Sequence, residues 1–160
     1  MARMLSENFT LDEMVFSQTA ARLGIDNTPS PEVLANLKRL AQALEQVRIA
    51  LGGVPILISS GYRSPALNKA IKGARNSAHV LGLAVDFTAP RFGTVLQTAK
   101  AAAASGASYD QIIHEYGRWV HMAIPAVGQQ ARVETLSIHV AGVYTPGLRG
   151  RGRPRSRTLA

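Results

Sequence analysis

The stretch Ser77-Ala78-His79-Val80-Leu81-Gly82-Leu83-Ala84-Val85-Asp86-Phe87-Thr88 combines a histidine and an aspartate with a short apolar run. Its second half, residues 83–88, has the β-branched and aromatic residues of a buried strand. Asp86 lies inside that run, where an unpaired carboxylate would be strongly destabilising. The sequence therefore predicts a buried strand whose aspartate needs a partner.

Further strands are predicted on both sides of this one. The stretches have alternating or continuous apolar residues and are bounded by glycine or turn residues. They are residues 54–59, 111–115, 119–124 and 133–140, with a turn at Tyr116-Gly117-Arg118 between the second and third. Strands that are close in sequence and joined by short turns favour antiparallel pairing.

Helices are predicted mainly before these strands. Thr10-Leu11-Asp12-Glu13 is a capping box for a short helix that Gly24 would end. Ser30-Pro31 starts a long amphipathic helix that runs to Gly52-Gly53, and residues 94–104 form an alanine-rich helix. The predicted fold is α+β, with N-terminal helices packed on a small, mostly antiparallel sheet.

Composition narrows the kinds of site that the chain can build. It has 160 residues and no cysteine, which excludes thiolate zinc sites, disulfides and cysteine nucleophiles. A metal would have to be held by histidine and carboxylate side chains. The first residues show no signal-peptide pattern, and no apolar run is long enough for a transmembrane segment. We therefore expect a protein that has no evident export signal.

The C-terminus differs from the rest of the chain. Five arginines alternate with Gly, Pro and Ser between positions 149 and 157 and supply much of the net charge of +8. We expect one domain over residues 1–145 and a disordered tail over residues 146–160. The tail could attract anionic wall or outer-membrane polymers, or serve only solubility. A specific nucleic-acid partner is not expected, because most of the net charge lies in the tail.

Two more polar residues are not explained by the packing of a hydrophobic core. His121 lies in the apolar stretch Trp119-Val120-His121, and Arg63 follows a predicted strand in Ser60-Gly61-Tyr62-Arg63-Ser64. His79, Asp86 and His121 together could hold Zn²⁺ and leave a fourth position for water. The simpler alternative is that Asp86 caps a turn and His121 is a hydrogen-bonded core histidine.

These motifs resemble those of the zinc D-alanyl-D-alanine carboxypeptidase family, which includes phage L-alanyl-D-glutamate endopeptidases. The family pattern S-x-H-x-x-G-x-A-x-D is matched by Ser77, His79, Gly82, Ala84 and Asp86, and its S-G-Y-R-S and W-V-H motifs by residues 60–64 and 119–121. Residues 8–10 and 27–31 resemble the phage and prophage branch. The resemblance covers roughly residues 8–125 and implies a D,D-peptidase-like fold.

The resemblance implies roles for individual residues. His79, Asp86 and His121 would be the zinc ligands, and Arg63 would stabilise an oxyanion or bind a substrate carboxylate. Glu115 is the candidate general base, although several relatives have the acid where this chain has Arg118. Ser77 and His114 are candidates for substrate contact, with His114 facing His121 if the turn has two residues. Gly82 would permit a turn between ligands, Asp110 would orient a ligand imidazole, and His139 matches no motif.

The expected function is hydrolysis of the peptide stems of bacterial peptidoglycan. By resemblance the chain would be a monomeric phage or prophage endolysin, held in the host cytoplasm before release to the wall, or a virion-associated enzyme. A bacterial D-Ala-D-Ala carboxypeptidase or dipeptidase and an inactive wall-binding module are the alternatives. The motifs leave open which bond is cut.

Overall fold

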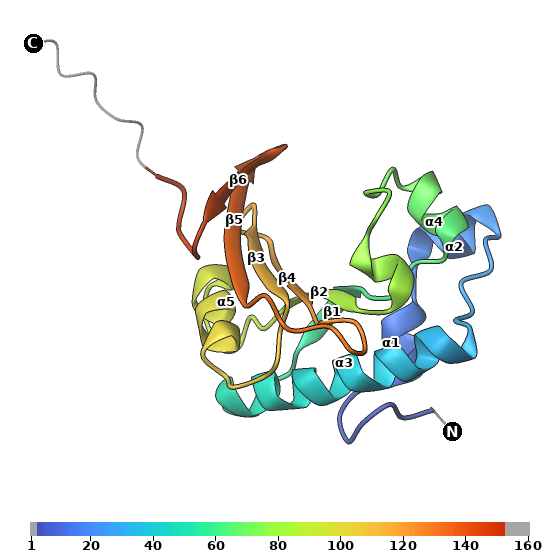
Figure 1. The fold of residues 1–160 in the computed structure, drawn as a ribbon, viewed down its shortest axis with the longest axis horizontal. Helices are drawn as coiled ribbons and strands as arrows, with labels where there is room; N and C mark the ends of the chain where they lie inside the picture. Colours follow the sequence, from blue (N-terminus) through green and yellow to red (C-terminus); the bar gives the residue numbers. More distant parts are fainter. Residues whose placement is uncertain (1–2, 153–160) are drawn as a thin grey trace, which may run out of the picture.

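The computed structural model describes residues 3–152, and it combines helices with one six-stranded sheet (Figure 1). The elements in chain order are α1 (Leu11–Val15), α2 (Gln18–Leu23), α3 (Pro31–Ala50), β1 (Leu57–Ser60), α4 (Pro65–Ala70), the 3₁₀ helix η1 (Ala78–Leu81), β2 (Ala84–Thr88), α5 (Val95–Ala103), β3 (Gln111–Glu115), β4 (Trp119–Ala123), β5 (Glu134–Val140) and β6 (Val143–Pro146). Within this part of the chain, no helix has both the length and the apolar character needed to cross a membrane.

The helices begin where the sequence predicts. The Thr10–Glu13 capping box starts α1, and the Ser30 hydroxyl accepts from the Val33 amide at the start of α3. The prediction of one helix before Gly24 is wrong, because the chain forms two. Phe16 adopts extended backbone after α1, and the Ser17 side chain then caps α2.

The sheet has the strand order β1-β2-β4-β3-β5-β6. All neighbouring pairs are antiparallel except β3 and β5, which are parallel. The α+β class and the mostly antiparallel sheet are therefore confirmed. The parallel pair arises because the chain leaves the β3–β4 hairpin through residues 124–133 and returns beside β3 in the same direction.

The two faces of the sheet have different functions because side chains alternate along each strand. The core face carries buried apolar residues that pack with α3 and α5, among them Val85, Phe87, Ile112, Val120 and Met122. The opposite face, here called the site face, carries Asp86, Glu115 and His121. In Figure 1, α5 and α4 lie on opposite sides of the sheet. The hydrophobic core therefore fixes the strands from one side and leaves the other side for polar groups.

The C-terminal boundary lies later than the sequence predicts. Strand β6 pairs with β5 through Pro146, the Gly147 amide donates to the Thr135 carbonyl, and Leu148 packs against the core. The Arg149 amide donates to the Ser137 hydroxyl at 2.9 Å. A disordered tail from residue 146 is therefore contradicted for residues 146–149. The predicted tail residues 153–160 lie outside the described residues.

Candidate metal centre

Three side chains with metal-binding chemistry meet on the site face. His79 comes from η1, Asp86 from β2 and His121 from β4, and the last two are direct cross-strand partners. The Asp86 Oδ1 atom lies 2.9 Å from His121 Nδ1 and 3.3 Å from His79 Nε2. One candidate ligand atom from each residue lies within 4.8 Å of the other two. The geometry therefore brings together the three residues that the sequence assigns to one metal.

Local backbone structure fixes the position of His79. The Ser77 hydroxyl accepts from the His79 amide, and Gly82 ends η1 with φ 71°. A β-carbon at position 82 would lie 2.8 Å from the Val33 side chain, so the turn also needs glycine for space. Gly82 therefore has the turn conformation that the sequence predicts, between the candidate ligands His79 and Asp86.

The hydrogen bonds of His79 leave one ring nitrogen available to a cation. Its Nδ1–H donates to the Gly61 carbonyl at 2.8 Å, which leaves the Nε2 lone pair directed at Asp86. A lone pair that faces a carboxylate at this distance requires a proton or a metal ion between them. Zinc ligands commonly have their second ring nitrogen bound to a backbone carbonyl in this way. The donor set of two imidazoles and one carboxylate suits Zn²⁺.

Asp86 is buried, at 7 % exposed, and still ionised. Burial raises the pKa of its carboxyl, but the hydrogen bonds with His121 and His79 oppose this effect, and the net pKa lies well below the usual range. The second oxygen, Oδ2, lies 3.5 Å from Arg63 Nη2. The carboxylate therefore carries the negative charge that a divalent cation requires.

Arg63 is held on a turn directly after β1. Its Nε–H donates to the Ser60 hydroxyl at 3.1 Å. Burial lowers the pKa of Arg63, against the opposing effect of Asp86.

The side chain of Asn27 fixes the same turn. Its Nδ2 donates to the carbonyls of Val15 and Tyr62, and its Oδ1 accepts from the Ser64 amide. Sequence reasoning did not predict this role for Asn27, since its partners are distant along the chain.

Glu115 lies at the end of β3 on the same face as the three ligands. A three-residue loop connects β3 to β4, so that Glu115 pairs with Trp119 and lies diagonally from His121. Its Oε1 atom is 3.9 Å from His121 Nδ1. Burial raises the pKa of Glu115, partly opposed by the nearby His121. The carboxylate therefore lies beside the candidate metal centre and has a raised pKa.

The family comparison agrees with this arrangement. The model of the family described as peptidase M15 matches residues 7–123, which include all three candidate ligands, Arg63 and Glu115. The chain belongs to the peptidase M15 family. Enzymes of this family are metallopeptidases that act on peptidoglycan and usually use zinc. The comparison with curated proteins gave no match.

The site of this M15 peptidase does not include His114. The odd-length loop places His114 opposite Val120 on the core face, where it is 4 % exposed. Its Nδ1–H donates to the Arg149 carbonyl at 3.0 Å, and His139 donates to the same carbonyl through Nε2 at 3.0 Å. The prediction that His114 contacts substrate or faces His121 is therefore wrong. His139, which matches no motif, lies outside the metal centre.

Asp110 also differs from its prediction. Both of its carboxylate oxygens accept from the Arg132 guanidinium, at distances of 2.8–3.1 Å. This ion pair holds the loop before β5 against the start of β3, and the acceptor of His79 is the Gly61 carbonyl. The prediction that Asp110 orients a ligand imidazole is wrong. Ser77 lines the hollow over the metal centre, as expected for a residue that could contact substrate.

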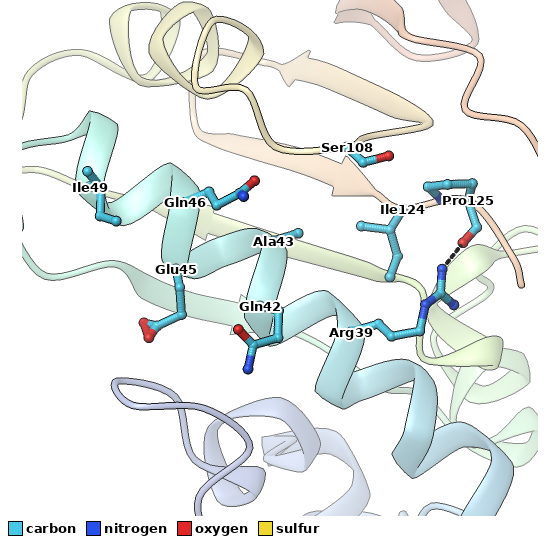
Figure 2. Close-up of a pocket in the computed structure, with 9 residues that line it drawn as sticks. All are labelled: Arg39, Gln42, Ala43, Glu45, Gln46, Ile49, Ser108, Ile124 and Pro125. Carbon is cyan, nitrogen blue, oxygen red and sulfur yellow. Dashed lines mark hydrogen bonds between the residues drawn. The ribbon is translucent and has the colours of Figure 1, made fainter.

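A separate hollow of about 330 Å³ lies along α3. Figure 2 shows Arg39 at one end, where its guanidinium donates to the Pro125 carbonyl, and Ile49 at the other. Glu45 is the only carboxylate among its lining residues, and it accepts hydrogen bonds from Asn8. This hollow therefore lacks the group of donors that a metal centre or hydrolytic site needs.

Proposed function

We propose that the chain is a phage or prophage endolysin that hydrolyses the peptide stems of bacterial peptidoglycan with one zinc ion. The observation that carries the proposal is that Glu115 and Arg63 flank the cluster of His79, Asp86 and His121 on one face of the sheet. When bound there, zinc would polarise the scissile carbonyl and make water a stronger acid. The protein side chains supply the remaining groups of a peptide hydrolase.

Glu115 is the proposed general base. It accepts a proton from the attacking water and returns it to the leaving amine. Its raised pKa, caused mainly by burial, makes the carboxylate a stronger base than an exposed glutamate. Its distance of 3.9 Å from His121 keeps it beside the metal centre, with a separate role from the three ligands.

Arg63 is the proposed oxyanion donor. Its guanidinium stays charged near neutral pH and is fixed in direction by Ser60 and by the turn that Asn27 holds. A fixed cation stabilises the negative charge that develops on the carbonyl oxygen as water attacks. Ser77 has a second proposed role, since its oxygen accepts from the His79 amide and its hydroxyl proton can be donated to a substrate carbonyl.

A direct experiment is digestion of purified peptidoglycan, followed by mass spectrometry of the new termini. We expect cleavage of stem peptides that stops after chelation and returns with added Zn²⁺. Glu115→Gln should bind the metal and fail to cut. Undigested peptidoglycan in the presence of Zn²⁺ would contradict the proposal.

The endolysin role needs its own test. Its support is the similarity of residues 8–10 and 27–31 to the phage and prophage branch. We expect cells that express the protein in the cytoplasm to lyse only when a separate pore-forming protein opens the inner membrane. Cleavage of purified peptidoglycan without lysis in the presence of that pore would favour a wall-remodelling enzyme instead.

The arginine-rich end is proposed to bind anionic wall or outer-membrane polymers. Arginines spaced by Gly, Pro and Ser can contact anionic groups without a folded surface. Truncation after Gly152 should reduce salt-sensitive binding to isolated anionic polymer and leave cleavage of a soluble stem peptide unchanged. Equal polymer binding by the full and truncated chains would contradict this role.

A further inference from the structure

Charged side chains are distributed unevenly along the chain. Residues 3–45 contain four basic and six acidic residues, for a net charge of −2, whereas residues 46–152 contain eleven and four, for a net charge of +7. The four acidic residues of the second part all have partners: Asp86 and Glu115 at the metal centre, Asp110 in its ion pair with Arg132, and Glu134 in a hydrogen bond with Gln111. This part of the fold therefore has many more basic side chains than acidic partners for them.

Two of these basic residues lie at a hollow of about 450 Å³ beside the start of α5. One wall is formed by the first residues of α5 and by the loop between β2 and α5, which carries Arg91 between the lining residues Pro90 and Gly93. The other wall is formed by Gly117 and Arg118 of the β3–β4 loop. The described residues that line this hollow include none of the candidate metal ligands, so it is separate from the metal centre.

The C-terminal segment brings two more arginines to the same end of α5. A β-carbon at Gly150 would lie 3.8 Å from the Leu96 side chain, in the first turn of this helix. Arg149 and Arg151 flank this contact in sequence, and Figure 1 shows the C-terminal end of the described chain passing beside α5. The arginines that gather from three segments around the start of α5 are here called the arginine surface: Arg91, Arg118, Arg149 and Arg151.

The arginine surface has no acidic partner within the described residues. All four side chains are exposed, and none of them forms an ion pair with another residue of the range 3–152. The stretches that supply them, residues 87–109, 116–133 and 135–152, contain no Asp or Glu. Like charges grouped in this way repel each other and do not stabilise a fold. A surface of this kind therefore favours an anionic ligand.

We propose that the arginine surface binds the phosphate groups of an anionic wall polymer that carries one phosphate in each repeat. Guanidinium groups form paired hydrogen bonds with phosphate oxygens. A phosphate at the hollow can contact Arg91 and Arg118 together, because its oxygens point in several directions. Arg149 and Arg151 can then contact further phosphates along the same polymer. This folded surface binds in addition to the arginine-rich end beyond Gly152, whose proposed role does not require it.

A polymer bound at the arginine surface leaves the metal centre open. Helix α5 packs on the core face of the sheet, whereas the candidate metal ligands lie on the site face. The enzyme can therefore hold the polymer and act on a stem peptide at the same time. The hollow also favours a polymer over a membrane, since a phosphate on a flexible chain can enter a recess between two loops and a bilayer surface cannot.

Binding to purified poly(glycerol phosphate) tests the arginine surface. The variant Arg91→Gln/Arg118→Gln, made in the full chain so that the arginine-rich end is still present, should bind roughly ten-fold more weakly than the native protein, with an affinity that depends less on salt. Arg91→Lys/Arg118→Lys keeps both charges and should retain most of the binding. Arg22→Gln removes an exposed arginine of α2 and should bind like the native protein. Equal affinity of the native protein and Arg91→Gln/Arg118→Gln would overturn the proposal.

Two further probes identify the partner. Polyglutamate is a polyanion without phosphate, and vesicles of phosphatidylglycerol present phosphate on a membrane. Arg91→Gln/Arg118→Gln should lose more affinity for poly(glycerol phosphate) than for either of these. A loss confined to the vesicles would assign the surface to membranes, and an equal loss with polyglutamate would show attraction to any polyanion. Either result would overturn the proposal.

The same variant separates this inference from the proposed function. Polymer binding should be the same with and without Zn²⁺, and Arg91→Gln/Arg118→Gln should cleave a soluble stem peptide at the native rate. Polymer binding without any cleavage of peptidoglycan by the native protein would contradict the proposed function and support the arginine surface. Cleavage at the native rate, with polymer binding unchanged in the variant, would overturn the arginine surface alone.

Discussion

Glu115 and His121 lie diagonally across neighbouring strands, with Glu115 Oε1 at 3.9 Å from His121 Nδ1. The relationship depends on the three-residue loop between β3 and β4. A loop of this length puts Glu115 on the face that carries Asp86 and sends His114 to the opposite face. Whether this loop has an odd or an even number of residues therefore decides whether Glu115 or His114 lies beside the metal centre.

Replacement of the Glu115 carboxylate should lower the rate of hydrolysis and leave metal binding unchanged. Glu115→Gln keeps the size of the side chain and removes the base, so kcat should fall on the order of 10²- to 10⁴-fold. Zinc content should stay at the level of the native enzyme, because Glu115 is not among the three ligands. Activity assays on a stem peptide would measure kcat, and elemental analysis would measure the zinc content. Glu32→Gln, at an exposed carboxylate of α3, is the control, and full turnover in Glu115→Gln would assign the base to another residue.

The close approach of Gly61 to α1 gives a second prediction. A β-carbon at position 61 would lie 2.3 Å from the Met14 carbonyl oxygen, which is backbone and cannot move aside easily. Gly61→Ala should lower the free energy of unfolding by about 1–3 kcal/mol or more and weaken zinc binding, since the Gly61 carbonyl also orients His79. Denaturant titration and zinc titration would measure the two effects. Gly152→Ala, where the added atom meets nothing within 4 Å, should match the native protein in both.

His114 should make stability depend on pH. Burial lowers its pKa in the folded chain, partly opposed by the hydrogen bond to the Arg149 carbonyl. The pKa of His114 in the unfolded chain is about 6.5. Above this pH the side chain is neutral in both the folded and the unfolded states, so it does not change the free energy of unfolding. As pH falls below that value the unfolded chain binds the proton more readily, and the free energy of unfolding decreases until the folded pKa is passed.

The variant His114→Gln removes this titration and keeps a donor for the Arg149 carbonyl. Between pH 7 and pH 5 the native protein should lose more stability than the variant, as urea denaturation at each pH would measure. Parallel pH profiles for the two proteins would contradict the expected direction of the pKa shift.

Two C-terminal truncations should differ in stability. Truncation after Pro146 removes Leu148 from the core and the carbonyl that accepts from His114 and His139. An unsatisfied buried donor costs about 1–3 kcal/mol, so the free energy of unfolding should fall by at least that amount. Truncation after Gly152 leaves these contacts intact and should change it little. Equal thermal midpoints for both truncations would contradict a structural role for residues 147–149.

Most of the fold could be predicted because its signals are local. Capping residues such as Thr10 and Ser30 start helices through contacts three residues away, and apolar runs such as residues 83–88 mark buried strands. The candidate metal ligands were accessible through the matched family motifs, since a buried aspartate and a histidine in an apolar strand show by themselves only that each needs a partner. The short strand β6 was missed because all four of its residues are exposed and it lacks an apolar pattern.

The remaining features depend on contacts that are distant in sequence. The partner of Asp110 is Arg132, 22 residues away, and Asn27 holds a turn 35 to 37 residues away. No periodicity or spacing marks such pairs. The face of the sheet on which His114 lies depends on the length of the β3–β4 loop. A loop longer or shorter by one residue would place His114 on the site face.

Zinc binding by matched histidine variants tests whether His79, Asp86 and His121 form a metal centre. Apo-protein would be titrated with Zn²⁺ against a chromophoric chelator, using native enzyme, His121→Ala and, as control, His139→Ala, which changes a histidine outside the cluster. We expect one zinc per native chain. His139→Ala should keep this affinity, and His121→Ala should lose more than the roughly 10- to 100-fold that follows loss of an outer hydrogen-bond partner. Equal zinc affinity in native enzyme and His121→Ala would contradict the metal centre.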